Sequence, residues 1–337
     1  MRIGIFAHTE SQQARALVEL FDSEQDTQCV LFDLSIPSDA ETSISPDKLF
    51  FAGERVDTLD VAILHGYSYD NPVVPQADDF QDFSVWQFGY LSTQQNQSYL
   101  FSLFSEMSRR GVEVLCPPRA HVLCYEKTHL LYRLKRSGVS VPSFILSNTM
   151  DDVVEFVSKN VCSVWRPSTG RALWQLFTDR QREFLINADK PPVMVAETVK
   201  GPFCRVFSFR GEPVMALKMG YPNAEPPENL EVLWEYEPSQ KLREACKLIY
   251  DSSDIGWAQV MGVEGDDTFW VYDVDTDPIL NWLPDAQRVS LLDSLALLLA
   301  GKQGEKKPLL EAEERSPLFL RRMLRILFDF EYAKYGN

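Results

Sequence analysis

The feature that most constrains the fold is the alternation of strand-like and helix-like segments over the first 115 residues. Short apolar stretches have the composition of buried strands, and longer stretches carry the helical spacing of apolar residues. Strands that alternate with helices predict a parallel sheet with helices on both of its faces. Residues 67–88 are predicted as a long polar and aromatic connection. The predicted strands cover residues 2–7, 28–32, 61–64 and 112–115, and the predicted helices cover residues 11–21 and 97–110.

The composition excludes several classes of protein. Hydrophobic residues make up 45% of the 337 residues, which argues against general disorder. The formal net charge of -16 is opposite in sign to that of most nucleic-acid-binding proteins. No apolar run is long enough to cross a bilayer, and the six cysteines include no CxxC pair. We therefore expect a soluble cytoplasmic protein with free thiols.

The rest of the chain is predicted to mix helices with antiparallel strands. Pro117-Pro118 marks a boundary, and residues 221–231 form an acidic, proline-rich loop that suits a mobile lid. Neither GxGxxG nor GxxxxGK[ST] occurs, so neither a dinucleotide-binding loop nor a P-loop is predicted. A helix is expected over residues 126–137, and strands over residues 193–199, 203–209, 213–219, 257–263 and 268–274.

Two aspartates lie at the end of the last predicted strand. The run Thr268-Phe269-Trp270-Val271-Tyr272 is rich in aromatic and β-branched residues, and Asp273 and Asp275 follow it. Alternate residues of a strand point to the same face, so both carboxylates would project together. Mg²⁺ is held by one or two carboxylates, and substrate phosphates complete its coordination. The pattern favours a metal site, and an acidic turn is the alternative interpretation.

Four basic residues lie where a charge is costly. Lys127 begins a predicted helix, and Arg166, Arg205 and Lys218 lie within or at the end of apolar strands. A cation among apolar residues loses its hydration unless it meets an anion. Each one alone also fits an exposed strand position or a structural ion pair. Together with the paired aspartates, they predict a cleft for phosphates and a metal, as phosphoryl transfer requires.

The order of these segments resembles the ATP-grasp superfamily, and within it the RimK-like group of ribosomal-protein glutamate ligases and their relatives. The resemblance covers about residues 1–300 in order and spacing. The matching segments are Pro117-Pro118, Glu126-Lys127, Gly138 with Val141-Pro142, Val164-Trp165-Arg166-Pro167, Met194 to Val199, Arg205 at the place of the family's Asp-x-Arg arginine, Gln259, and Asp273-Val274-Asp275-Thr276-Asp277-Pro278.

The resemblance implies a fold of the α/β plus α+β class, an ATP-grasp fold behind an N-terminal Rossmann-like domain. It places that first domain at residues 1–116 and a small ATP-grasp lobe at residues 117–190. A larger lobe with the metal site would occupy residues 191–301, and residues 302–337 would form a linker and an amphipathic helix.

The resemblance also implies an activity, which is ATP-dependent ligation of a carboxylate to an amine or thiol through an acyl-phosphate. The cofactors would be ATP and Mg²⁺, and the other substrate a small molecule, an amino acid or a peptide. By this resemblance Lys127 and Arg166 hold the α- and β-phosphates, and Arg205 stabilises the transferring phosphate. Glu197 and Thr198 line the adenine-ribose edge, and Lys218 also binds nucleotide. The residues that hold Mg²⁺ are Gln259, Asp273 and Asp275.

The sequence departs from the family pattern at several of these positions. Arg166 replaces a lysine, Phe203 replaces the aspartate of Asp-x-Arg, and the glycine-rich phosphate loop shrinks to Ser168-Thr169-Gly170-Arg171. An acidic loop after the third strand would favour a cationic or amine-bearing substrate. These departures support an alternative function, a catalytically degenerate ATP-grasp protein that binds nucleotide or peptide as a scaffold subunit.

The C-terminal segment lies outside the resemblance. Apolar residues recur at helical spacing from Ser316 onward, which predicts an amphipathic helix over about residues 316–333. Packing of its apolar stripe on the body of the protein is the simplest expectation. Docking to a partner, to a second copy in a homo-oligomer or to an anionic membrane surface is the alternative.

Overall fold

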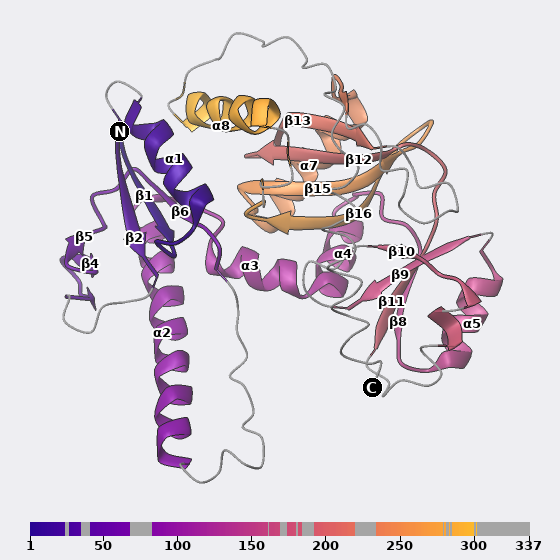
Figure 1. The fold of residues 1–337 in the computed structure, drawn as a ribbon, viewed down its shortest axis with the longest axis horizontal. Coiled ribbons are helices and arrows are strands. Elements are labelled where there is room, and N and C mark those ends of the chain that lie inside the picture. The colour runs from indigo at the N-terminus through magenta and orange to yellow at the C-terminus, as the bar shows by residue number, and fades with distance from the viewer. Residues whose placement is uncertain are drawn as a thin grey trace. The chain divides into compact units, whose positions relative to one another are not determined.

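The chain divides into two units, each of which is described by itself. Unit 1 is Met1–Tyr125 with Asp254–Gly256, and unit 2 is Glu126–Ser253 with the chain from Trp257 onward. The computed structural model describes residues 1–23, 27–34, 41–67, 83–160, 162–168, 174–179, 181–183, 192–219, 234–278, 280, 283, 285–299 and 301 (Figure 1). The predicted helix at 316–333, the acidic loop at 221–231 and Thr169 to Arg171 lie outside these residues.

Unit 1 is built on a parallel sheet, as the alternation of strands and helices predicts. The strand order is β2-β1-β6-β7, and Ile5 of the central strand β1 pairs with Leu31 of β2 and with Ile63 of β6. The central strands β1 and β6 are buried, whereas the edge strands β2 and β7 are partly exposed. The elements are β1 (Arg2–Ala7), α1 (Gln12–Ser23), β2 (Gln28–Asp33), β6 (Val61–Leu64), β7 (Glu113–Leu115) and α3 (Pro118–Tyr125).

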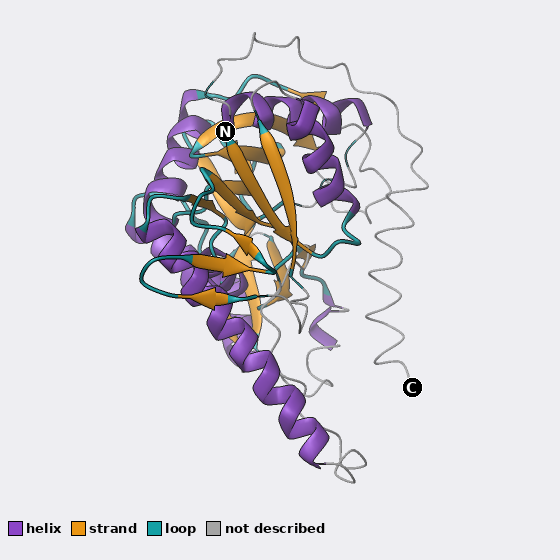
Figure 2. Ribbon diagram, turned by 90° about the vertical axis from the view of Figure 1, so that its left-hand side faces the viewer, coloured by secondary structure: helices purple, strands orange, loops and turns teal. Residues whose placement is uncertain are grey.

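Helix α2 (Phe83–Arg109) is longer than the sequence predicts. Its C-terminal part buries Leu100, Leu103, Phe104 and Met107 in the core of unit 1. These residues have the helical spacing on which the predicted helix over residues 97–110 rests. Its N-terminal part extends beyond the sheet and exposes Leu91 (Figures 1 and 2). The predicted connection over 67–88 was therefore wrong from residue 83 onward. The polar run over residues 92–97 interrupts the apolar spacing, so the sequence pattern marks the helix only from residue 97.

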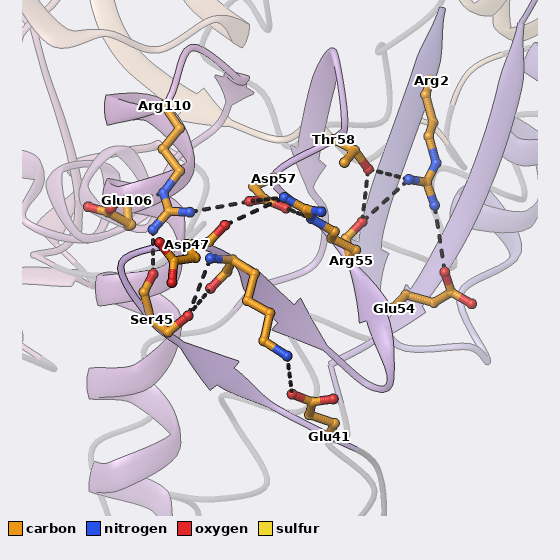
Figure 3. Close-up of polar contacts among 11 residues, drawn as sticks. Arg2, Glu41, Ser45, Asp47, Glu54, Arg55, Asp57, Thr58, Glu106 and Arg110 are labelled. Carbon is orange, nitrogen blue, oxygen red and sulfur yellow. Dashed lines mark hydrogen bonds and ion pairs between the residues drawn. The ribbon is translucent and has the colours of Figure 1, made fainter.

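A small sheet of order β3-β4-β5 was not predicted. It comprises β3 (Ser43–Ile44), β4 (Leu49–Phe51) and β5 (Glu54–Arg55), and Phe51 of β4 packs edge-on against Phe6 of β1. Figure 3 shows the polar network that fixes it. The Asp57 carboxylate accepts from Arg55 Nε at 2.7 Å and from Arg110 Nη1 at 3.2 Å. Asp57 thus joins a residue that precedes α2 in the sequence to one that follows it.

Unit 2 contains two antiparallel sheets. The smaller has the order β10-β9-β11-β8, and α5 (Met150–Ser158) packs on it through Val153. The larger has the order β14-β13-β12-β15-β16, and α7 (Gln240–Ser253) packs against β13 and β16 (Figure 1). The smaller sheet comprises β8 (Phe144–Ser147), β9 (Ser163–Pro167), β10 (Gln175–Leu176) and β11 (Val193–Glu197), and the larger comprises β12 (Phe203–Phe209), β13 (Glu212–Met219), β14 (Trp234–Glu235), β15 (Trp257–Glu264) and β16 (Phe269–Thr276).

Two further helices among the described residues belong to unit 2. Helix α4 (Lys127–Arg136) contacts α7 and β16, and α8 (Asp285–Leu299) contacts β13. The hairpin predicted over 257–263 and 268–274 is present as β15 and β16, with one difference. β16 runs to Thr276, so Asp273 and Asp275 lie inside the strand and are buried. Of the residues described, no helix is long and apolar enough to span a membrane.

A bulge interrupts the pairing of β15 with β16. Met261 pairs with Asp273 and Gly262 pairs with Val271, so Tyr272 is an extra residue on β16. A bulge bends the strand and changes the direction of the side chains beside it. Gly262 allows the close approach, since a Cβ atom there would lie 2.4 Å from the carbonyl oxygen of Trp270.

We expect Gly262→Ala to destabilise unit 2 by about 2–3 kcal/mol, because the added methyl group has no space in the hairpin. Calorimetric unfolding of the full chain measures the change. Gly89→Ala is the control, since no atom lies within 4 Å of a Cβ at this helical position. The control should be neutral or stabilise α2 by about 0.5–1 kcal/mol. Equal effects of the two substitutions would contradict the role given to Gly262.

The six cysteines are free thiols that differ in exposure. Cys162 is exposed, and the other five are buried. Burial raises the pKa of the thiols of Cys204 and Cys246, to about 11 and about 12. Since the thiolate is the reactive form, we expect one rapid reaction per chain with Ellman's reagent under native conditions and six after denaturation. Cys162→Ser should remove the rapid phase, and a second rapid thiol in the native protein would contradict this burial pattern.

Candidate active site

One face of the larger sheet of unit 2 gathers most of the predicted site residues. Arg205 of β12 pairs with Met261 of β15, and Met261 pairs with Asp273 of β16. Two residues further along the strands, Gln259 of β15 pairs with Asp275 of β16. Side chains two residues apart share a face, and directly paired residues share it as well. Regular pairing therefore places Arg205, Gln259, Asp273 and Asp275 on one face.

Lys127 reaches this face from the first residue of α4. Its Nζ atom lies 2.7 Å from Asp273 Oδ1, forms a second ion pair with Asp275, and donates to the carbonyl oxygen of Val274 at 2.9 Å. The Lys127 side chain is only 2% exposed. An ammonium group this deeply buried requires several oxygen partners, and the three contacts supply them.

Arg166 reaches the same aspartate from β9 of the smaller sheet. Its Nη1 atom is ion-paired with Asp273 Oδ2, and its Nε donates to the carbonyl oxygen of Pro167 at 3.2 Å. The guanidinium carbon lies 5.6 Å from the ring centre of Trp174, a cation–π contact. The Arg166 side chain is 1% exposed, so the charge that the sequence places in an apolar strand is buried and paired.

Both oxygens of the Asp273 carboxylate are engaged. Oδ1 accepts from Lys127 and from the backbone N–H of Val274 at 2.8 Å, and Oδ2 accepts from Arg166. Burial alone would raise the pKa of Asp273, but the charges and hydrogen bonds of Lys127 and Arg166 outweigh it and lower the pKa below its usual value. Asp273 is therefore ionised at neutral pH.

Arg205 contributes a third positive charge. Desolvation lowers the pKa of the Arg205 guanidinium to about 10, while the negative charges of Asp275 and Asp273 oppose that shift. The group stays protonated at neutral pH and is held beside the two carboxylates. We call Lys127, Arg166, Arg205, Asp273 and Asp275 the buried charge cluster, which carries three positive and two negative side chains. Arg205 is half-buried at its edge, and the other four residues are buried.

The comparisons with known proteins identify the fold. No protein-family model and no curated protein matches the sequence. The ATP-grasp ligase PsnB, solved with precursor peptide PsnA2 and AMPPNP, superposes with a TM-score of 0.72 at 17% identity over 89% of this chain and 97% of its own. The macrocyclase MdnC of Microcystis aeruginosa, solved with precursor peptide MdnA, gives 0.65 at 12% identity over 90% and 100%. The protein has the ATP-grasp fold.

A third match supports the same conclusion. A RiPP-associated ATP-grasp ligase of Chryseobacterium gregarium, solved with ADP and a leader and core peptide, gives a TM-score of 0.66 at 13% identity. That match covers 92% of this chain and 99% of the other. The predicted ATP-grasp fold is therefore confirmed over most of the chain.

The cluster can be tested as a metal site of an ATP-grasp fold. Asp273, Asp275 and Gln259 offer two carboxylates and an amide oxygen on one face, a donor set of the oxygen type that Mg²⁺ accepts. Within the described part of the chain, no three His, Cys, Asp or Glu side chains form a group that suits a metal. The three residues fit Mg²⁺ when ligand phosphates complete the coordination and both Lys127 and Arg166 turn away from the aspartates.

The predicted adenine edge lies at the end of β11. The Glu197 carboxylate accepts from the backbone N–H of Ser143 at 2.8 Å. The Glu197 carbonyl oxygen accepts from the Tyr272 hydroxyl at 2.7 Å, and the N–H of Val199 donates to that hydroxyl at 2.8 Å. The backbone N–H of Thr198, between them, donates to the carbonyl oxygen of Cys162.

Tyr272 was not among the predicted site residues. Regular alternation along the strand would turn it away from Asp273. The bulge removes this alternation, and the one sequence signal for a bulge was Gly262 inside a strand pattern.

Lys218 is not brought to the buried charge cluster. It pairs with Cys204, the neighbour of Arg205, and so lies on the opposite face of the sheet. There its Nζ atom lies 3.1 Å from Glu264 and 4.3 Å from the ring centre of Tyr236. Its assignment to nucleotide binding remains a prediction.

We expect Asp273→Asn to destabilise unit 2 by about 3–5 kcal/mol, since it leaves Lys127 and Arg166 buried without their shared anion. Urea unfolding measures the change. Asp275→Asn should cost less, because Lys127 then keeps Asp273. Glu155→Gln removes an exposed ion pair with Lys159 and should leave the midpoint unchanged. A neutral Asp273→Asn would show that the pairing contributes nothing to stability.

Proposed function

We propose that the protein is an ATP-dependent ligase that joins a carboxylate to an amine through an acyl-phosphate, with a peptide as the substrate. The observation that carries this proposal is the convergence of Lys127, Arg166 and Arg205 on Asp273 and Asp275. The cations come from α4, β9 and β12, so three separate elements direct positive charge to one point on β16. Cations beside carboxylates are the components of a phosphate and Mg²⁺ site.

In this proposal the charges exchange partners when substrate binds. Lys127 and Arg166 release the aspartates and bind phosphate oxygens instead. Asp273, Asp275 and Gln259 would be the residues that hold Mg²⁺, and the ion would supply neutralisation of phosphate charge. The exchange replaces each buried ion pair with another, so no buried charge loses its counter-ion. Glu197 and Thr198 lie at the adenine-ribose edge, as the family resemblance implies.

Arg205 is proposed to act on the transferring γ-phosphate. A substrate carboxylate is a poor electrophile, because its oxygen is a poor leaving group. Its attack on the γ-phosphate forms the acyl-phosphate and releases ADP, and attack by the amine then forms the amide and releases phosphate. Arg205 would stabilise the negative charge that develops during the first transfer.

The substrate class is supported by the structures that share the fold. PsnB, MdnC and the Chryseobacterium gregarium ligase were each solved with a precursor or core peptide. We extend this to the present chain as a proposal, because the likeness extends over nearly the whole length of each ligase. A cytoplasmic location suits both the use of ATP and the free thiols.

A second candidate function, a scaffold subunit, is supported by the protein partners that the buried charge cluster already has. Both oxygens of Asp273 already have protein donors, and the Tyr272 hydroxyl already occupies the end of β11. A site that is complete without ligand also suits a scaffold subunit that binds peptide and no longer ligates.

ATP turnover separates the two functions. With Mg²⁺ and a panel of peptides, amines and acids, we expect ADP release that Asp275→Asn abolishes. Arg205→Gln should lower the rate about 100-fold or more and change the Kd for ATP only a few-fold, since its charge acts on the transfer. Glu155→Gln serves as the control and should turn over as the unmodified protein does. Tight ATP binding without turnover would favour the scaffold, and no binding of MgATP by calorimetry would exclude both.

A further inference from the structure

The Tyr272 hydroxyl fastens the end of β11 to β16. It donates to the carbonyl oxygen of Glu197 at 2.7 Å and accepts from the backbone N–H of Val199 at 2.8 Å. These backbone groups belong to one segment and are separated only by Thr198. A single hydroxyl therefore forms hydrogen bonds with two neighbouring backbone groups, the Glu197 carbonyl and the Val199 N–H.

The bulge in β16 explains how Tyr272 reaches this place. Adjacent residues of a regular strand point to opposite faces. Here Tyr272 reaches β11 and its neighbour Asp273 reaches Arg166 of β9, so both contact the smaller sheet. The extra residue at the bulge permits this arrangement.

The surroundings of the Tyr272 ring suit a flat aromatic group. Tyr272 is 5% exposed and belongs to an apolar cluster with Val164, Ala196 and Val263. Trp174 meets the ring edge-on, with 5.8 Å between ring centres. The ring thus has apolar neighbours, and its hydroxyl contacts the Glu197 carbonyl and the Val199 N–H, which we call the polar pair. Apolar walls with a few polar groups are typical of a site for a small heteroaromatic ligand.

The polar pair has the order that adenine requires. Adenine carries an amino donor beside a ring-nitrogen acceptor, which complements a carbonyl oxygen followed by an N–H. On the corresponding edge of guanine, an acceptor oxygen takes the place of the amino donor, so guanine does not complement the pair. We propose that Tyr272 competes with adenine for the Glu197 carbonyl and the Val199 N–H, and so determines nucleotide affinity and base selectivity. This proposal rests on the proposed function, because it takes ATP as the ligand.

The competition has a measurable consequence. ATP binds only the fraction of molecules in which Tyr272 has left the pair, so the apparent Kd equals the intrinsic Kd divided by that fraction. Tyr272→Phe keeps the ring and removes the hydroxyl, which leaves the polar pair without its partner in the free protein. We expect MgATP to bind about ten-fold more tightly to this variant, the change for about one hydrogen bond. Binding of MgGTP should not tighten.

Calorimetric titration of the full chain with MgATP and with MgGTP provides the test. Tyr250→Phe is the matched control, since Tyr250 lies on α7 and its Cβ packs beside Gly211 at the β12–β13 turn. A lower Kd for MgATP in Tyr272→Phe alone supports the proposal. An unchanged or weaker MgATP affinity in Tyr272→Phe overturns it, and so does an equal gain for MgGTP, because a general loosening of the protein would act on both nucleotides.

Amide exchange at Val199 gives a second measurement, which does not depend on affinity. In the free protein this N–H should be protected, and in free Tyr272→Phe it should exchange at least ten-fold faster. MgATP should restore protection in the variant, and MgGTP should not. Equal protection in both free proteins would overturn the proposal. If Tyr272→Phe fails to fold, Tyr272→Leu takes its place in both measurements.

The outcomes also separate this proposal from the proposed function. Binding of MgATP by the unmodified protein, with no gain in Tyr272→Phe, overturns only the role of Tyr272. Failure of both proteins to bind MgATP overturns the nucleotide site itself, and the competition with it.

Discussion

The shared ion pairing of Asp273 with Lys127 and Arg166 is the interaction on which the rest of unit 2 depends. The aspartate lies on the larger sheet, Arg166 lies on the smaller sheet, and Lys127 begins α4. Three elements that are distant in sequence therefore meet at one carboxylate. Because every charge is almost fully buried, none can lose its partner without a large cost. The same constraint that holds the elements together also concentrates the charge that a phosphate compound needs.

Much of this arrangement could be predicted from the sequence, for a physical reason. A lysine or arginine among apolar residues requires an anion, and two aspartates on alternate strand positions share a face. These two rules select Lys127, Arg166, Arg205, Asp273 and Asp275, but they also select Lys218, which lies on the opposite face of the sheet. They do not say which cation meets which anion in the free protein. The direct pairing of the predicted phosphate ligands with the predicted metal ligands emerged only from the structure.

The parts that could not be predicted depend on local irregularity. The β15–β16 bulge turns Tyr272 toward β11, whereas a regular strand pattern directs it away. The start of α2 at Phe83 was missed because the polar run over residues 92–97 interrupts the apolar spacing that marks a helix. The sheet of β3, β4 and β5 consists of strands of two or three residues, too short to show alternation. Lys218 was placed correctly on a strand but lies on the other face.

Two contacts join the two sheets of unit 2, the Arg166–Asp273 ion pair and the hydrogen bonds of Tyr272 with β11. They affect the rate of ligand binding as well as the affinity. A ligand that needs these groups has to wait until they separate, and the separation is a property of the protein alone. The observed rate of association would then stop rising at high ligand concentration and level off at the rate of opening. At high ligand concentration the rate of opening would limit binding. Only at low ligand concentration would the rate of collision limit it.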